Sequence, residues 1–210
     1  MKIPFLIFLI LTIIGCKNQK DENSNILSNG IQNYQPFKEN IDSLEIKPGI
    51  EYDYFEYKIG PKSKTTLISK SVLKDSTKRN QLKKSFDSIQ VQNGFAEFPH
   101  LFGFHYIVSA KNEKIAIWDS KEELKQFLGD INTETEALIY IMSLGFPPIE
   151  NDTTQTAVKK YKSSYVVRAT RMDSLCNPII ANRYTFKIDK NGIQDTLEIK
   201  EIYRNEKGCI

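Results

Sequence analysis

The 210-residue chain is poor in the side chains on which enzymes and metal sites depend, with two histidines, three cysteines and one tryptophan. It also lacks the GxSxG, HExxH and glycine-rich phosphate-loop motifs of hydrolases, zinc peptidases and nucleotide-binding proteins. His100 and His105 would point to opposite faces of a strand, whereas a metal site needs three or four converging ligands. The sequence therefore assigns no catalytic residue, no cofactor and no metal, and it favours a protein that is not an enzyme.

The chain also has little excess of positive over negative charge. The chain has 29 Lys and Arg against 26 Asp and Glu, which is a formal net charge of +3. A protein that binds nucleic acid usually presents a concentrated basic face. The balance therefore argues against nucleic acid as a partner.

Only one long apolar run is present, and it lies at the start of the chain. Residues 3–14 are almost wholly apolar and follow the single charge of Lys2. A helix of this length is about 18 Å long, whereas the hydrocarbon core of a bilayer is about 30 Å thick. The run is too short to span a membrane, and it is typical of a secretory signal peptide.

The run ends in Ile13-Ile14-Gly15-Cys16, which resembles the lipobox of bacterial lipoproteins. The resemblance implies cleavage before Cys16, a diacylglyceryl group on its sulfur and an acyl chain such as palmitate on its amine. Because several chains anchor a protein stably, the bilayer is the first expected partner. The resemblance places the protein in the cell envelope, as an outer-membrane lipoprotein on the periplasmic face or the cell surface. The alternatives are an uncleaved anchor and an ordinary signal peptide.

A polar segment follows the cysteine, and it has too few apolar residues to offset the entropy cost of ordering. Within it, Gln19-Lys20-Asp21-Glu22 resembles the surface-export signal of Bacteroidetes lipoproteins, with a solvated charged tether as the alternative. We therefore divide the chain into a signal peptide at 1–15, a lipidated cysteine with a flexible polar tether at 16–45, and a single α+β domain at 46–210.

Alternation of apolar residues and turn signals predict the strands of the domain. They fall at residues 50–59, 65–72, 104–110, 114–118, 161–170, 179–188 and 196–203. The last three should form an antiparallel meander. Asn191-Gly192, between the last two, predicts a type I′ turn, which requires a positive φ at both central residues.

Capping residues predict about three short helices. One should begin at Ser76 and run to about residue 89, and the other two should begin at capping boxes. These boxes are Ser120 with Glu123 and Thr133 with Glu136. The predicted fold is α+β: a mostly antiparallel sheet that includes the C-terminal three-stranded meander, with the helices packed on it. The step Phe127-Leu128-Gly129-Asp130-Ile131, the helix start at Thr133–Ala137 and the terminal Cys209-Ile210 resemble uncharacterised Bacteroidetes lipoproteins, a resemblance that implies no activity.

Two cysteines remain after Cys16, namely Cys176 and Cys209. Export places them in an oxidising compartment, where a pair is expected to form a disulfide. They would lie at the same edge of the meander, and closing this loop should stabilise the fold by about 3–4 kcal/mol. Two buried free thiols are the alternative.

The stretch at residues 95–106 is the densest in aromatic residues, and it is interrupted by Pro99 and Gly103. Because proline cannot donate to a central ladder, part of the stretch should be loop. Apolar loop residues either fold back onto the core or stay exposed to bind a partner. In the second case the ligand or partner contacts would be Phe95, Phe98, Phe102 and His105.

Six Asp-Ser or Asp-Thr pairs followed by an aliphatic residue or threonine resemble the O-glycosylation tripeptide of Bacteroidetes secreted proteins. Ser43 and Thr153, in predicted loops, are the best acceptors among them. The structural alternative is that Asp-Ser and Asp-Thr cap helices and start turns.

Three functions are compatible with these features. The first is a non-enzymatic envelope lipoprotein that binds an envelope protein, a peptide or a glycan. The second is a structural accessory subunit of an outer-membrane complex, which a contiguous exposed apolar patch would favour. The third is an envelope hydrolase that uses His105 with Asp119 or Asp53, which requires His105 in a cleft near a carboxylate or hydroxyl.

Overall fold

The structure is a computed structural model, and it describes residues 34–36, 45–61, 65–98, 103–147 and 154–209. The chain divides into two units, Met1–Tyr34 and Gln35–Ile210, and the helices and strands of the described residues all belong to the second unit. The signal peptide, Cys16 and the tetrapeptide 19–22 lie outside the described residues.

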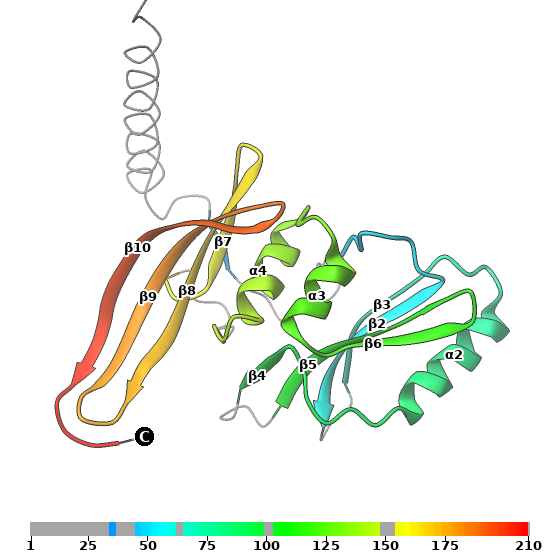
Figure 1. The fold of residues 1–210 in the computed structure, drawn as a ribbon, viewed down its shortest axis with the longest axis horizontal. Coiled ribbons are helices and arrows are strands. Elements are labelled where there is room, and N and C mark those ends of the chain that lie inside the picture. Colours follow the sequence, from blue (N-terminus) through cyan, green and yellow to red (C-terminus); the bar gives the residue numbers. More distant parts are fainter. Residues whose placement is uncertain (1–33, 37–44, 62–64, 99–102, 148–153, 210) are drawn as a thin grey trace, which may run out of the picture. The chain divides into compact units, whose positions relative to one another are not determined.

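Two antiparallel sheets form the frame of the second unit (Figure 1). The first, which we call the β5 sheet, has the order β3-β2-β5, and both β4 and β6 pair with the remaining edge of β5. Its strands are β2 (Tyr54–Pro61), β3 (Thr65–Ser71), β4 (Ala96–Phe98), β5 (Gly103–Lys111) and β6 (Lys114–Trp118).

The second, the β9 sheet, has the order β1-β7-β8-β9-β10. Its strands are β1 (Gln35–Pro36), β7 (Ala157–Tyr161), β8 (Ser164–Leu175), β9 (Ile179–Asp189) and β10 (Gly192–Asn205). Strands β8, β9 and β10 form the predicted meander, and together with the helices they confirm the α+β class.

Helices cover both faces of the β5 sheet because both faces of β2 and β5 are apolar. The helix α2 (Ser76–Ser88) packs Phe86 against Tyr54 and Tyr106 on one face. The helix α3 (Lys121–Leu128) packs Phe127 against Phe55 on the other face. The strands β2 and β5 are therefore buried on both sides, and their charged residues Glu56 and Lys58 do not reach water.

The helix α4 (Glu134–Met142) lies between the two sheets (Figure 1). Its Ile139 and Met142 join the core of the β5 sheet, while Leu138 and Ile141 join the core of the β9 sheet. A helix that is apolar on all sides is expected to be buried on all sides. The sequence ALIYIM of this helix therefore explains why it joins the two cores.

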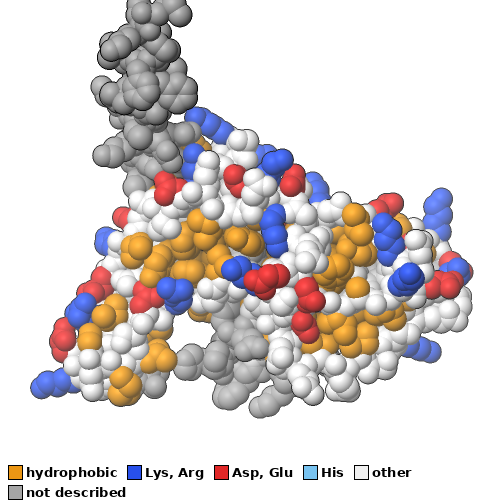
Figure 2. Space-filling view, in the orientation of Figure 1, with side chains coloured by type: hydrophobic (Ala, Val, Ile, Leu, Met, Phe, Trp, Pro, Cys, Tyr) orange, Lys and Arg blue, Asp and Glu red, His pale blue; other side chains and the backbone are white. Residues whose placement is uncertain are grey.

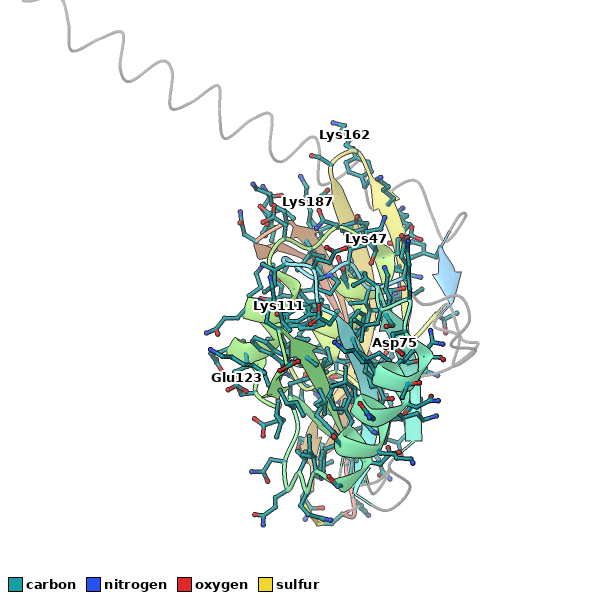
Figure 3. All side chains as sticks on the ribbon, turned by 90° about the vertical axis from the view of Figure 1, so that its right-hand side faces the viewer. Lys47, Asp75, Lys111, Glu123, Lys162 and Lys187 are labelled. Carbon is teal, nitrogen blue, oxygen red and sulfur yellow. A yellow bond between two sulfur atoms is a disulfide. The ribbon has the colours of Figure 1, made fainter. Side chains whose placement is uncertain are left out.

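The helix starts are mostly as predicted. Both capping boxes are present, since Ser120 and Thr133 accept hydrogen bonds from the backbone amides of Glu123 and Glu136. The prediction of Ser76 as a cap was wrong, because Asp75 accepts from the amides of residues 77 and 78 at the start of α2 (Figure 3). The carboxylate of Asp75 reaches these amides from one residue earlier in the chain.

The last hairpin forms as predicted, but its turn is not type I′. The turn residues are Lys190 and Asn191, and only Gly192, paired with Asp189, has a positive φ, of 132°. A Cβ at Gly192 would lie 2.6 Å from the hydroxyl of Tyr140. Glycine is therefore required at the start of β10 both by the backbone conformation and by the close approach of α4.

The strand predicted at 161–170 begins at the last residue of β7 and otherwise lies in β8. A turn with Lys162 at a φ of 53° separates β7 from β8, and Lys162 lies at its tip (Figure 3). Tyr161 and Ser164 pair with each other across this turn. The expected strand therefore begins at Ser164 and continues to Leu175, and β7 was missed.

The predicted disulfide is present. Cys176, just after β8, is bonded to Cys209, just after β10, with 4.2 Å between the Cα atoms. The two residues also form an isolated β-bridge. The bond therefore fastens the C-terminal end of β10 to the neighbouring end of β8.

Candidate binding cleft

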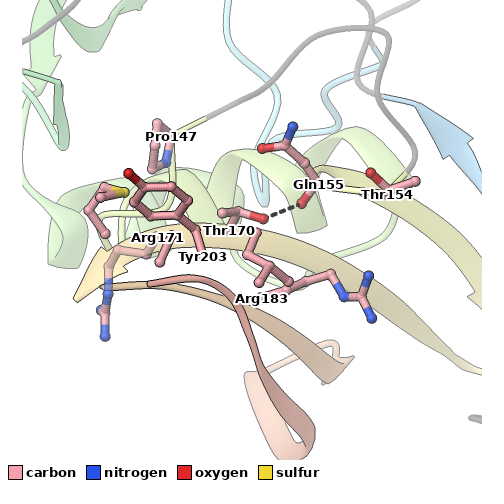
Figure 4. A pocket seen from close by; sticks show the side chains of 10 residues that line it. Pro147, Thr154, Gln155, Thr170, Arg171, Arg183 and Tyr203 are labelled. Atoms are coloured by element: carbon pink, nitrogen blue, oxygen red, sulfur yellow. Dashed lines mark hydrogen bonds between the residues drawn. The ribbon is translucent and has the colours of Figure 1, made fainter. Parts of the chain in front are cut away.

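A cleft of about 570 Å³ lies on the β9 sheet, over the C-terminal part of β8 and the facing parts of β9 and β10 (Figure 4). Its apolar lining comes from Pro147, Met172, Ala181, Ile202 and Tyr203. Its polar lining comes from Thr154, Gln155, Thr170, Arg171 and Arg183. The Thr170 hydroxyl donates to the Gln155 carbonyl over 3.3 Å, which holds one wall against the sheet. Ligand pockets commonly measure about 300–1,000 Å³, so the volume suits a small molecule.

A β-bulge shapes the apolar end of the cleft. Glu201 pairs with Asn182 and Tyr203 pairs with Ala181, so Ile202 is an extra residue in β10. Neighbouring residues of a regular strand point to opposite faces. Because the bulge interrupts this alternation, both Ile202 and Tyr203 line the same cleft.

The apolar side chains of the cleft are unusually exposed. Met172 is 36% exposed, Ile202 41% and Tyr203 49%. Figure 2 shows apolar side chains at the surface near the free ends of β8 and β10, at the lower left. Covering such side chains with an apolar ligand removes their surface from water, which favours binding.

Arg183 is the most buried charged group in the cleft. Its side chain is 16% exposed, and its Nε atom is buried without a hydrogen-bond partner in the described part of the chain. Glu198 is an acidic partner of Arg183, and its Oε2 lies 3.7 Å from the Arg183 Nη2. This distance is too long for a hydrogen bond. Arg183 therefore forms an ion pair with Glu198 but no hydrogen bond to it.

The guanidinium of Arg171, the other arginine of the cleft, is already bound by Asp173 and packed on Phe146. Its Nε donates to Asp173 Oδ1 over 2.8 Å, and its guanidinium lies 4.7 Å from the centre of the Phe146 ring. Figure 4 shows the two arginine head groups pointing in opposite directions. The guanidinium of Arg183 is therefore the one available for an additional acidic partner.

Further cations share the sheet face on which Arg183 lies. Directly paired residues of neighbouring strands point to the same face, so Lys200 shares the face of Arg183, and Arg168 and Lys159 lie at alternate positions on it. The pKa of Lys159 is lowered, first by burial and then by the charge of Arg168. Glu198 also lies on this face and forms an ion pair with Arg183.

The β5 sheet holds a different charged cluster, which is closed to solvent. Lys58 Nζ lies 2.7 Å from Glu56 Oε2 and 2.8 Å from Asp87 Oδ1, and neither the Lys58 nor the Glu56 side chain is exposed. Tyr54 donates its hydroxyl proton to Glu56. Burial alone would lower the pKa of Lys58, but its bonds to Asp87 and Glu56 outweigh burial and raise it. Because the side chains of Glu56 and Lys58 are fully buried, a ligand has no access to them. The role of the cluster is structural, since the bond from Lys58 to Asp87 joins α2 to the sheet.

His105 lies in the core rather than in a cleft. It is 7% exposed, its Nδ1 lies 2.7 Å from the hydroxyl of Tyr57, and burial lowers its pKa to about 4. Asp53 lies beside Ala110, about 16 Å further along β5. Asp119 precedes α3, where burial and then a hydrogen bond with Glu123 raise its pKa. We therefore do not assign hydrolase chemistry to His105.

The described side chains of the aromatic stretch at residues 95–106 pack into the core. Phe95 and His105 are buried, and the Phe95 ring stacks on Tyr57. The contact site predicted on these two residues is therefore not supported, because both side chains lie in the core. Phe98 ends β4, but its side chain, like the whole of Phe102, lies outside the described part.

Ser43 and Thr153, the predicted glycosylation sites, also lie outside the described residues. Within the described ranges, no group of three or more His, Cys, Asp or Glu could hold a metal ion. In the same ranges, no helix is both long and apolar enough to cross a membrane. Comparison with protein-family models, with curated proteins and with solved structures finds no match.

Sequence reasoning missed the cleft altogether. Arg183 and Tyr203 lie in strands that were predicted, but alternation alone does not show which face of the sheet stays open. The extra residue Ile202 leaves no signal in the pattern of β10. Nothing short of the register could have shown that Ile202 and Tyr203 line one surface.

Proposed function

We propose that this protein is a lipid-anchored binding module of the bacterial cell envelope, without enzymatic activity, that takes its ligand in the cleft of the β9 sheet. The anchor is Cys16, and its support is the lipobox resemblance at residues 13–16. The anchor would keep the module at the outer membrane, on the periplasmic face or the cell surface. The tether at 16–45 would hold the binding domain away from the bilayer.

One observation carries the proposed binding role. The cleft combines three exposed apolar side chains, Met172, Ile202 and Tyr203, with the largely buried cation Arg183. Pockets that bind small molecules are mostly apolar and contain a few polar groups that orient the ligand. The cleft has this composition, whereas the buried cluster around Lys58 and the core residue His105 do not offer an accessible surface.

The test compares two exposed residues of β10. Tyr203→Ala removes an apolar wall of the cleft, whereas Ile199→Ala removes a side chain that is 60% exposed and does not line it. The full-length protein is purified from envelopes of its native host, and bound small molecules are extracted and identified by mass spectrometry. We expect one class of molecule with the wild type and with Ile199→Ala, and its loss with Tyr203→Ala.

Two outcomes contradict the proposal. An identical set of molecules with all three proteins means that they associate outside the cleft. No bound small molecule, together with an envelope protein present in equal molar amount, supports the accessory-subunit alternative instead.

A further inference from the structure

The charge environment of Arg183 indicates what kind of ligand the cleft selects. A guanidinium keeps its charge at every physiological pH and has five N–H donors. In Arg183 the Nε donor is buried and unbonded, and the carboxylate of Glu198 lies beyond hydrogen-bond distance. A buried donor without an acceptor is unfavourable. An acidic group from the ligand would instead bond the Nη donors at the tip of this guanidinium, for which the described residues provide no hydrogen bond.

Burial also strengthens the attraction between Arg183 and an anion. The interaction between two charges grows as the surroundings become less polar. The Arg183 side chain is 16% exposed, so water screens it less than the exposed Lys200 beside it on the same face. The positive charges of Arg183 and Lys200 therefore favour a negative ligand at this face.

The remainder of the ligand must be apolar. Met172, Ile202 and Tyr203 line the cleft with exposed apolar surface, and Tyr203 offers a ring on which a flat or extended group can pack. A ligand that is charged throughout would leave this surface in water. A ligand that is apolar throughout would leave Arg183 without an acceptor.

We infer that the cleft binds a small amphipathic anion, in which a carboxylate or phosphate group bonds Arg183 and an apolar body packs against Met172, Ile202 and Tyr203. This inference rests on the binding role proposed above, and it adds the chemical class of the ligand. The carboxylate and the phosphate share the chemistry that a guanidinium recognises, since both offer two oxygens to its fork of donors.

Four probes with one phenylbutyl body separate the head group from the apolar part. They are 4-phenylbutyrate, 4-phenylbutyl phosphate, 4-phenylbutanol and 4-phenylbutylamine. Each is titrated into the full-length protein in nanodiscs, and heats from empty nanodiscs are subtracted. We expect at least one anion to bind about tenfold or more tightly than the alcohol, and the amine to bind most weakly.

Variants then locate the head group. Arg183→Gln should bring the affinity for the anions to within about threefold of that for the alcohol, and Arg183→Lys should keep part of the preference, because it retains charge but loses the fork. The matched control is Arg204→Gln, an exposed arginine of β10 that pairs with Glu201. This control should leave all four affinities unchanged. A thermal melt of each variant verifies folding, and the wild-type panel tests the inference without any substitution.

The results distinguish this inference from the proposed function. If the alcohol and amine bind as tightly as both anions, and Tyr203→Ala weakens all four probes, the cleft binds ligands but the anionic class is wrong. If no probe binds, or Tyr203→Ala changes no affinity, neither the inference nor the cleft as a binding site survives. A preference for anions that persists in a folded Arg183→Gln variant also overturns the assignment to Arg183.

Discussion

Replacing Lys58 by methionine should destabilise the protein severely, because the Lys58 side chain is fully buried and bonded to two carboxylates. Lys58 is held between Glu56, at 2.7 Å, and Asp87, at 2.8 Å. Methionine has nearly the same length but no charge. The substitution therefore leaves the volume of the side chain almost unchanged and removes only the partner of a buried carboxylate.

The size of the effect follows from the burial of Glu56. The Glu56 side chain has no exposure to solvent, and without Lys58 its carboxylate would rely on the hydroxyls of Tyr54 and Thr66. Removal of one member of a buried ion pair typically costs about 3–5 kcal/mol, because the other charge stays buried without compensation. We expect Lys58→Met to lower the free energy of unfolding by this amount. Asp87→Asn should cost about 1 kcal/mol or less, because Asp87 is half exposed.

The assay is urea unfolding followed by the fluorescence of Trp118, the single tryptophan, which packs against Phe127 in the core of the β5 sheet. The control is the double variant Glu56→Leu with Lys58→Met, which removes both buried charges. This variant should recover most of the loss, because an apolar pair of similar volume often replaces a buried ion pair without cost. The reasoning is refuted if Lys58→Met unfolds within about 1 kcal/mol of the wild type, or if the double variant is less stable than the single.

Three further outcomes are expected. Burial lowers the pKa of His105 from 6.5 to about 4, so the stability it contributes is present above pH 6.5 and is lost as the pH falls towards 4. The free energy of unfolding should fall by about 3 kcal/mol over this range. Unfolding curves of His105→Gln measured between these pH values should lack this pH dependence. Reduction of the Cys176–Cys209 bond, 33 residues apart in sequence, should cost about 3–4 kcal/mol in a thermal or urea melt, and two titratable thiols in the untreated folded protein would contradict the bond. Cys16→Ser should yield an unlipidated protein that is released from membranes, and mass spectrometry of the wild type should find a mature chain that begins at acylated Cys16; any other N-terminus disproves the lipobox prediction.

Local signals predicted much of the fold because they act over a few residues. The capping box of Ser120 with Glu123 and the strands β5 and β6 follow from neighbouring residues, and they were predicted at nearly the right places. The type I′ assignment at Asn191-Gly192 failed because the same dipeptide also suits a turn placed one residue earlier. Here the approach of Tyr140 from α4 is a tertiary feature that no local pattern contains.

The candidate site could not be predicted, because it depends on which faces remain uncovered. Glu56 and Lys58 alternate with aromatic residues along β2, a pattern that would suit a solvent-facing row. They are buried because α2 covers that face and supplies Asp87. Conversely, Ile202 and Tyr203 look like ordinary strand residues, and only the bulge and the exposure of this end of the β9 sheet make them part of a cleft.

The claim that the cleft contacts a ligand in the cell can be tested directly by photo-crosslinking in the native host. Benzoylphenylalanine replaces Tyr203 in one strain and Ile199 in another, since both positions are exposed on β10 and only Tyr203 lines the cleft. After irradiation of whole cells, intact-protein mass spectrometry should find a discrete added mass at position 203 and none at position 199. Equal labelling at both positions, or no adduct at position 203, contradicts the account.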